Sequence, residues 1–201
     1  MSFSKPFAKS LPVLLLALAV LPATAASVTY EIDPAHTFPS FEADHMGLSV
    51  FRGQFNRSSG QVVLDKAAGT GTLAVEIDVA SIDFGQDELN ALMAKPDYFD
   101  TAQHPTARYT GKLAGFVDGK PTRVDGALTL RGVTRPLTLE IRSFKCMPHP
   151  IFKRDWCGAD AHATFDRADF GIDAGKDFGF DMGVTLRIQV EAVAAAVADA
   201  G

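Results

Sequence analysis

Several features that often reveal a function are absent from this 201-residue sequence. It contains no CxxCH haem-attachment motif, no HExxH zinc motif and no glycine-rich phosphate loop between a strand and a helix. It has no block of basic residues, and its formal net charge is −5. An acidic chain without basic clusters argues against nucleic acid or an anionic membrane as the main partner. We therefore predict no catalytic residue, no metal site and no nucleic-acid partner.

Cysteine is scarce, since only Cys146 and Cys157 occur. In an exported protein an even count of cysteines indicates a disulfide, and we predict that these two are bonded. A second interpretation stays open, because Met147 and His149 lie beside Cys146. Thiolate, thioether and imidazole together are ligands for copper or haem iron, provided that the thiols are free.

Long apolar runs are limited to one stretch, Leu11–Ala23, which is too short to span a bilayer. Basic residues precede this run and the small residues Ala23-Thr24-Ala25 follow it. This arrangement is typical of a secretory signal peptide, and we predict one over residues 1–25 with cleavage after Ala25. The alternative is an uncleaved membrane anchor. Residues 26–201 are then long enough for one domain with a good core.

Alternating apolar and polar residues dominate the remaining chain, which is typical of β-strands with one apolar face. The clearest case is Val124–Ile141, where two alternating arms flank Gly132 and predict a hairpin. The only convincing helical pattern is Asp87–Met93. Further strands are expected over residues 27–32, 41–45, 51–55, 61–64, 71–79, 106–117, 158–165 and 183–192. The fold class is therefore all-β, and the pattern alone is compatible with a sandwich or a closed barrel.

Four motifs resemble one known family when they are taken together. They are DPAHTFPSFEADHMGLSVFRGQF at 33–55, ALMAKPDYFDTAQHPTARY at 91–109, VDGALTLRGVTRPLTLEI at 124–141 and FDRADFGI at 165–172. Their order and spacing are similar to those of the YceI family of bacterial periplasmic proteins. The resemblance implies a lipocalin-like antiparallel β-barrel of about eight strands with one short helix. It also implies a periplasmic location and a long apolar interior that holds a polyisoprenoid or a similar amphiphile.

With this resemblance, the apolar faces of the strands become candidate walls of a cavity. Without it, an ordinary packed core explains the same faces better. The predicted ligand-binding residues are Phe41, His45, Phe51, Phe55, Leu73, Val75, Ile77, Phe99, Tyr109, Leu128, Leu130, Leu137, Leu139, Ala161 and Phe165. Small residues on the same faces favour an open space, and they are Gly53, Gly126, Ala159, Ala161 and Ala163.

A few polar residues have alternative interpretations. His45 shares a face with Phe41, so it is either a hydrogen-bonding partner for a ligand head group or a structural histidine. Asp33 and His36 are expected to form a local pair that holds a kink in the first strand. Arg167 and Asp169 are expected to be an exposed pair in a turn.

Two functional hypotheses follow. The first is a periplasmic binding or carrier protein for an isoprenoid or other long-chain lipid, such as a prenyl quinone or its precursor, with no cofactor beyond that lipid. The second is a redox component that serves a membrane electron-transfer protein through a bound quinone or a metal. An enzyme acting on lipid is a weaker third option, and either a monomer or a dimer is compatible with the sequence.

Overall fold

The computed structural model describes residues 27–196, so the predicted signal peptide lies outside the described residues. Eleven strands form one sheet, and α1 is the only α-helix in the described part of the chain. The strands are β1 Val28–Ile32, β2 Phe38–His45, β3 Ser49–Phe55, β4 Ser58–Asp65, β5 Thr70–Asp78, β6 Ile82–Asp83, β7 Thr106–Ala114, β8 Arg123–Leu130, β9 Val133–Pro148, β10 Asp155–Asp166 and β11 Gly183–Ala194. Helix α1 is Asp87–Met93, as the sequence predicts.

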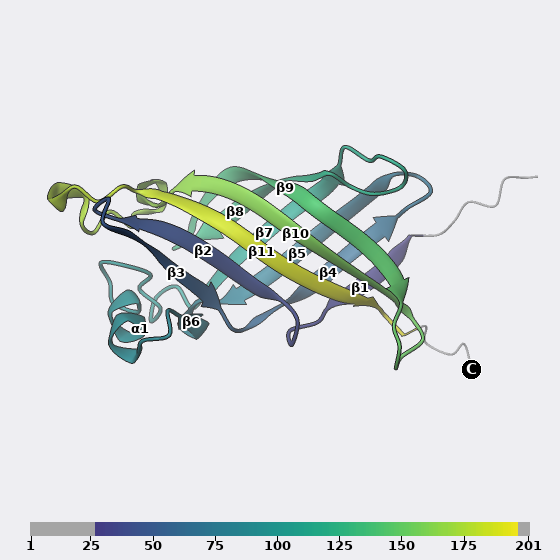
Figure 1. Ribbon diagram of the computed structural model, residues 1–201, viewed down its shortest axis with the longest axis horizontal. Coiled ribbons are helices and arrows are strands. Elements are labelled where there is room, and N and C mark those ends of the chain that lie inside the picture. The colour runs from purple at the N-terminus through teal and green to yellow at the C-terminus, as the bar shows by residue number, and fades with distance from the viewer. Residues whose placement is uncertain (1–26, 197–201) are drawn as a thin grey trace, which may run out of the picture.

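Eight strands close a ring in the order β1-β4-β5-β7-β8-β9-β10-β11, with β11 pairing back to β1. All of these pairings are antiparallel, so the all-β barrel expected from the resemblance is confirmed. The remaining strands β2, β3 and β6 continue the sheet from β11 at one end of the barrel (Figure 1). Closure pairs every inner strand on both sides and leaves few exposed sheet edges.

The kink at residues 33–37 explains how β11 serves both parts of the sheet. Ala192–Ala194 at the end of β11 pair with β1, whereas Val184–Gln189 pair with β2. Strands β1 and β2 thus follow one another along the same edge of β11. Pro34 lacks a backbone donor, which suits the break between them.

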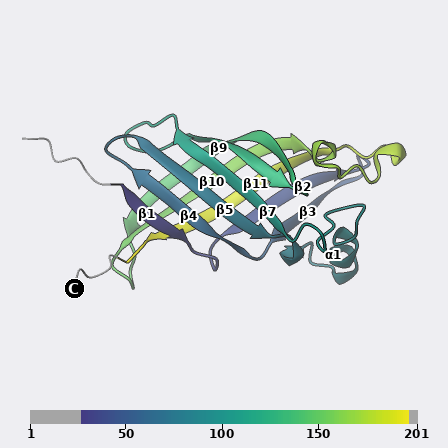
Figure 2. The ribbon, with the colours of Figure 1, turned by 180° about the vertical axis from the view of Figure 1, so that it is seen from behind.

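The two ends of the barrel are built from different segments. Figures 1 and 2 show α1, the β2–β3 hairpin and the β10–β11 connection at one end, which we call the mouth. The β7–β8 loop, the β9–β10 hairpin and the start of β1 lie at the other end, which we call the base. No helix within residues 27–196 has the length and apolar character needed to cross a bilayer.

Several strand boundaries differ from the predicted ones. Strand β7 ends at Ala114 rather than residue 117, because Gly115 adopts a left-handed φ of +64°. Strand β4 starts at Ser58, before the predicted start at residue 61. The largest difference is that β9 and β10 extend beyond their predicted bounds through residues 142–148 and 155–157, which makes the hairpin between them longer than the predicted strands allow.

The Val124–Ile141 hairpin forms in the predicted place. Arg131 and Gly132 occupy its two-residue turn with φ values of +49° and +73°. Positive φ at both positions gives the tight turn whose twist matches that of the flanking strands. Val124, Leu128 and Leu130 of one arm are buried, as are Leu137 and Leu139 of the other.

Candidate ligand-binding site

A cavity of about 580 Å³ lies inside the barrel. Every strand except β6 contributes to its wall, and α1 adds Leu89, Leu92 and Met93. All fifteen side chains predicted to bind ligand lie along this cavity. The wall is almost entirely aliphatic and aromatic, so the space suits an apolar molecule. Whether these residues bind a ligand stays a prediction.

Two glycines on the inner faces do not create space, contrary to the expectation from their size. A Cβ on Gly53 would lie 2.6 Å from the Phe41 ring, and one on Gly126 would lie 2.5 Å from the Tyr109 hydroxyl. Neither glycine belongs to the cavity wall, because an aromatic ring from the neighbouring strand occupies each position. Gly53 sits within the regular pairing of β2 and β3.

The alanines of β10 divide into two groups. Ala159 and Ala161 line the cavity, and Ala161 is 5% exposed. Ala163 does not line it, and instead packs against the apolar core. A register shift in the pairing with β9 lies between Asp160 and Ala161. Space therefore continues along only part of this predicted row of small residues.

Tyr109 places a polar group deep in the apolar wall. Its hydroxyl donates to the carbonyl oxygen of Leu137 at 2.8 Å and lies 3.3 Å from that of Val124. Burial raises the pKa of Tyr109, so the phenol stays neutral at physiological pH. The hydroxyl is satisfied within the protein and leaves the cavity wall apolar at this point.

The mouth carries most of the polar side chains of the cavity. Asp44, His45, Tyr98 and Arg167 line it there. The His45 ring stacks on Phe51 with centroids 4.3 Å apart and an interplanar angle of 13°. Packing of this kind is compatible with both interpretations of His45, as a structural residue and as a partner for a head group.

Arg167 corrects the prediction of an exposed turn pair with Asp169. Its guanidinium donates to the carbonyl oxygens of Ile172 and Ala174 at 2.9 Å each, and it lines the cavity. Partial burial lowers the pKa of Arg167. Its partners lie within the β10–β11 connection, where no strand periodicity could indicate which way the side chain points.

Two aromatic residues of the β10–β11 connection were also not predicted as part of the site. Phe178 and Phe180 both line the cavity, and the Phe180 ring meets His45 edge-on with centroids 5.1 Å apart. Phe178 is nevertheless 77% exposed. Apolar surface is therefore continuous from the cavity to the outside at the mouth.

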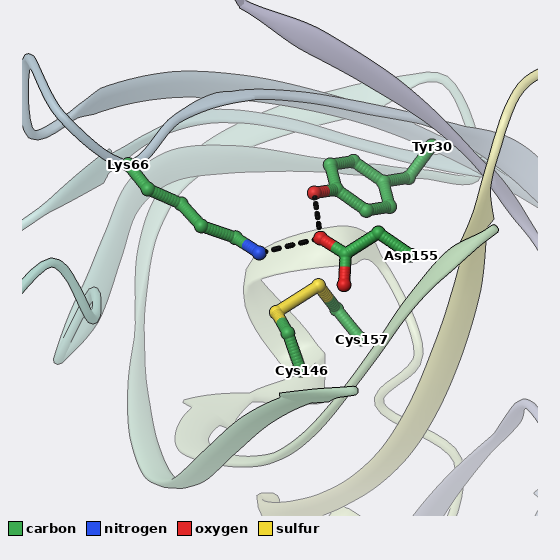
Figure 3. The surroundings of a disulfide bond; sticks show 5 residues. All are labelled: Tyr30, Lys66, Cys146, Asp155 and Cys157. Atoms are coloured by element: carbon green, nitrogen blue, oxygen red, sulfur yellow. Dashed lines mark hydrogen bonds and ion pairs between the residues drawn. A yellow bond between two sulfur atoms is a disulfide. The ribbon is translucent and has the colours of Figure 1, made fainter. Parts of the chain in front are cut away.

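At the base, Tyr30 and Cys157 belong to the cavity wall, and a partly exposed polar group and the disulfide lie beside them (Figure 3). The Tyr30 hydroxyl donates to Asp155 Oδ2 at 2.7 Å, and Lys66 Nζ lies 2.5 Å from the same oxygen. Burial raises the pKa of Asp155, but the hydrogen bonds from Lys66 and Tyr30 outweigh it and lower that pKa below its usual 3.8. These side chains come from β1, the β4–β5 turn and β10, so they join three segments of the wall.

The predicted disulfide between Cys146 and Cys157 is confirmed. The two residues face each other across β9 and β10, and Cys157 is part of the cavity wall. Asp155 also lies close to both sulfur atoms. Since the bond uses both thiols, this segment lacks the free thiolates that the copper or haem interpretation required.

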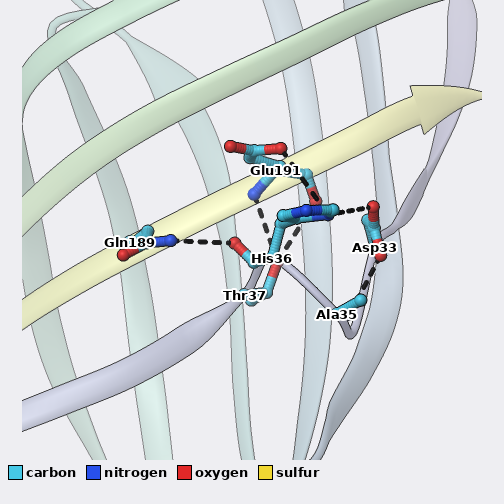
Figure 4. A network of polar contacts seen from close by, with 6 residues as sticks. All are labelled: Asp33, Ala35, His36, Thr37, Gln189 and Glu191. Atoms are coloured by element: carbon cyan, nitrogen blue, oxygen red, sulfur yellow. Dashed lines mark hydrogen bonds and ion pairs between the residues drawn. The ribbon is translucent and has the colours of Figure 1, made fainter.

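Asp33 and His36 form the predicted pair at the kink (Figure 4). His36 Nδ1 lies 2.7 Å from Asp33 Oδ2, and the backbone N–H of Ala35 donates to Asp33 Oδ1 at 2.9 Å. The hydrogen bond to Asp33 raises the pKa of His36. Glu191 Oε2 lies 4.0 Å from the same imidazole nitrogen. This pair thus holds the kink to Glu191 of β11, and neither Asp33 nor His36 lines the cavity.

Comparison with known proteins places the chain among relatives of the same fold. The family model of the YceI-like domain matches residues 30–194. A UPF0312 protein of Pseudomonas putida strain W619 is 30% identical over 172 residues, which cover 82% of this chain and 87% of that protein. Protein YceI of Escherichia coli O6:H1 is 33% identical over 122 residues, covering 59% of this chain and 63% of that protein.

Solved structures agree with this assignment. BcnA of Burkholderia cenocepacia matches with a TM-score of 0.64 at 23% identity, covering 80% of this chain and 98% of that one. A polyisoprenoid binding domain from Saccharophagus degradans matches with a TM-score of 0.58 at 20% identity, covering 84% and 99%. At these identities the likeness establishes the fold alone. From the family match and the sequence relatives together, the chain belongs to the family of YceI-like domains.

Proposed function

We propose that this protein binds a polyisoprenoid or a similar long-chain amphiphile inside its barrel. The observation that carries the proposal is the cavity of about 580 Å³ with its nearly unbroken apolar wall. Its volume lies within the roughly 300–1,000 Å³ typical of small-molecule sites. The likeness in fold to a polyisoprenoid binding domain of Saccharophagus degradans supports the same class of ligand.

Affinity should come mainly from the tail of the ligand. Each buried CH₂ contributes about 0.8 kcal/mol, so a few isoprene units outweigh a head-group hydrogen bond at about 1 kcal/mol. The polar residues gather at the mouth, where Asp44, His45 and Arg167 line the cavity. We infer that the tail lies along the barrel and the head group stays at the mouth, with loose selection among head groups.

The proposed setting is the periplasm, and the proposed role is that of a carrier. The support is the apolar run Leu11–Ala23 with its basic start and small-residue cleavage site. A long-chain lipid needs a protein shell to cross an aqueous compartment, because exposed apolar surface is unfavourable in water. A prenyl quinone or its precursor has the required long tail and small head, and a quinone would connect the protein to membrane electron transfer.

Mass spectrometry of an organic extract of the purified protein tests this function. We expect a long-chain isoprenoid lipid in the extract, and a visible or near-ultraviolet band if the lipid is a quinone. Added prenyl lipid should raise the melting temperature of the delipidated protein, because a ligand that binds only the folded state stabilises it. An extract without lipid, together with an unchanged melting temperature, would contradict the proposal.

A further inference from the structure

Charged residues are distributed unevenly between the segments at the two ends of the barrel. At the mouth, residues 166–181 carry aspartates at 166, 169, 173, 177 and 181 against the basic residues Arg167 and Lys176. Residues 145–154 at the base contain Lys145, Lys153 and Arg154 and no acidic residue. The acidic net charge predicted no anionic membrane partner, but the β9–β10 hairpin carries a local excess of basic residues up to Asp155, which is paired with Lys66.

The tip of the β9–β10 hairpin combines these basic residues with exposed apolar ones. Ile151 is 76% exposed and Phe152 is 54% exposed, directly before Lys153 and Arg154. Val117 belongs to the β7–β8 loop and is 60% exposed; this loop lies at the same end of the barrel, on the opposite side from the tip (Figures 1 and 2). Neither Ile151 nor Phe152 lines the cavity, so ligand binding does not explain their exposure.

The conformation of this tip is fixed by hydrogen bonds. The backbone N–H groups of Ile151 and Phe152 both donate to His149 Nδ1 at 3.1 Å. The backbone N–H of Lys153 donates to the His149 carbonyl at 3.0 Å, and that of His149 donates to the Arg154 carbonyl at 2.7 Å. These bonds fix the backbone of the tip before any partner binds, which reduces the entropy cost of docking. The Phe152 ring stacks on the His149 ring with centroids 4.4 Å apart, and Ile151 is the more exposed of the two apolar residues.

We propose that this basic apolar tip docks the barrel onto an anionic phospholipid bilayer. Ile151 and Phe152 enter the boundary between head groups and acyl chains, while Lys145 and Lys153 meet the phosphates. Each basic residue near an anionic surface contributes about 1 kcal/mol. Lys145 and Lys153 form no ion pair within the described residues, so their charges are available.

The mouth fits this partner less well. Leu48 and Phe178 are exposed there too, at 82% and 77%. However, Phe178 lies between aspartates of the β10–β11 connection, and an anionic surface repels carboxylates, whereas Leu48 on the β2–β3 turn has no basic residue beside it in the sequence. Docking through the base leaves the mouth facing the aqueous compartment. The inference does not depend on the identity of any ligand in the barrel.

Flotation with vesicles of phosphatidylcholine, alone or mixed with phosphatidylglycerol, tests the docking. The sample is the protein purified after secretion from the host that expresses it. We expect binding only to the mixed vesicles, with loss at high salt. Lys153→Gln should weaken binding about fivefold, and Ile151→Ser should weaken it at least about tenfold. The matched mouth variants Lys176→Gln and Leu48→Ser should bind like the parent.

The single tryptophan gives a second readout at the base. Trp156 lies next to the tip, with its ring 4.9 Å from that of His149. Brominated lipids in contact with the base should quench its emission. Lipids in contact with the mouth should not, because β10 has 12 residues, is about 40 Å long and carries Trp156 at its base end. Unchanged melting temperatures show that the variants are folded. Absence of binding to the mixed vesicles, absence of quenching, or a larger loss in the mouth variants than in the tip variants would overturn the proposal.

Discussion

Replacing Ala161 with phenylalanine distinguishes a cavity from a packed core. Ala161 lies on β10 and faces the cavity, as predicted, with 5% of its surface exposed. A phenyl ring at this position extends into the space where the ligand tail is proposed to lie. The neighbouring inward position Ala163 packs against the core without lining the cavity, so Ala163→Phe is a matched control on the same strand.

The two substitutions should affect different quantities. At Ala161 the added ring enters open space, so the free energy of unfolding of the delipidated protein should change little. If the ring displaces about four ligand carbons, the loss of about 3 kcal/mol weakens binding roughly a hundredfold. At Ala163 the ring lies outside the cavity against the core cluster, so any loss should appear in stability and lipid binding should stay at the parent's value.

Denaturant unfolding of the delipidated variants measures the first quantity, and titration with a prenyl lipid measures the second. A large stability loss for Ala161→Phe with unchanged binding would show that Ala161 packs in a filled core. Equal effects of the two substitutions would also refute the reasoning, because the structure assigns them different surroundings. The parent and both variants are compared at one protein concentration, since bound ligand shifts apparent stability.

Three further predictions concern the wall and the base. Gly126→Ala should lower the free energy of unfolding by ~1–3 kcal/mol in denaturant melts, because the new methyl would lie 2.5 Å from the Tyr109 hydroxyl. Thiol titration of the denatured, unreduced protein should find no free thiol, and replacing Cys146 and Cys157 by alanine should cost about 3 kcal/mol in the same melts. The Asp155 carboxylate has a pKa below its usual 3.8, so its contribution is present above that pH and is lost as the pH falls through the folded pKa. The difference in unfolding free energy between the parent and Asp155→Asn should therefore shrink between neutral and strongly acidic pH.

Much of the barrel could be predicted because alternation reports directly on burial. The one-sided pattern of residues 71–79 and 124–141 assigns Leu73, Val75 and Leu128 to the inner face, where the structure places them. The helix Asp87–Met93 was predictable from its acidic first turn and apolar stripe. Alternation within one strand identifies which face is inside, but it carries no information on what fills the inside.

The remaining features depend on contacts between distant segments. Gly126 leaves no space because the Tyr109 ring from the adjacent strand occupies it. Arg167 points into the mouth because two backbone carbonyls of its own loop receive its guanidinium. The extension of β9 and β10 was hidden by Pro148 and Pro150, which interrupt the pattern near the hairpin tip. Such effects follow from the tertiary arrangement and have no periodic signal in the sequence.

The different construction of the two ends follows from the kink at residues 33–37. Because β1 and β2 share one edge of β11, the ring closes on β1 at the base, while β2 and β3 extend the sheet beyond it at the mouth. The base carries Tyr30, Asp155 and the disulfide, whereas the mouth is bounded by α1 and the β10–β11 connection. A lipid exchanged through the mouth does not have to pass the base. The proposed docking through the tip and the proposed ligand exchange through the mouth would use separate surfaces, so substitutions at one end should leave the other function intact.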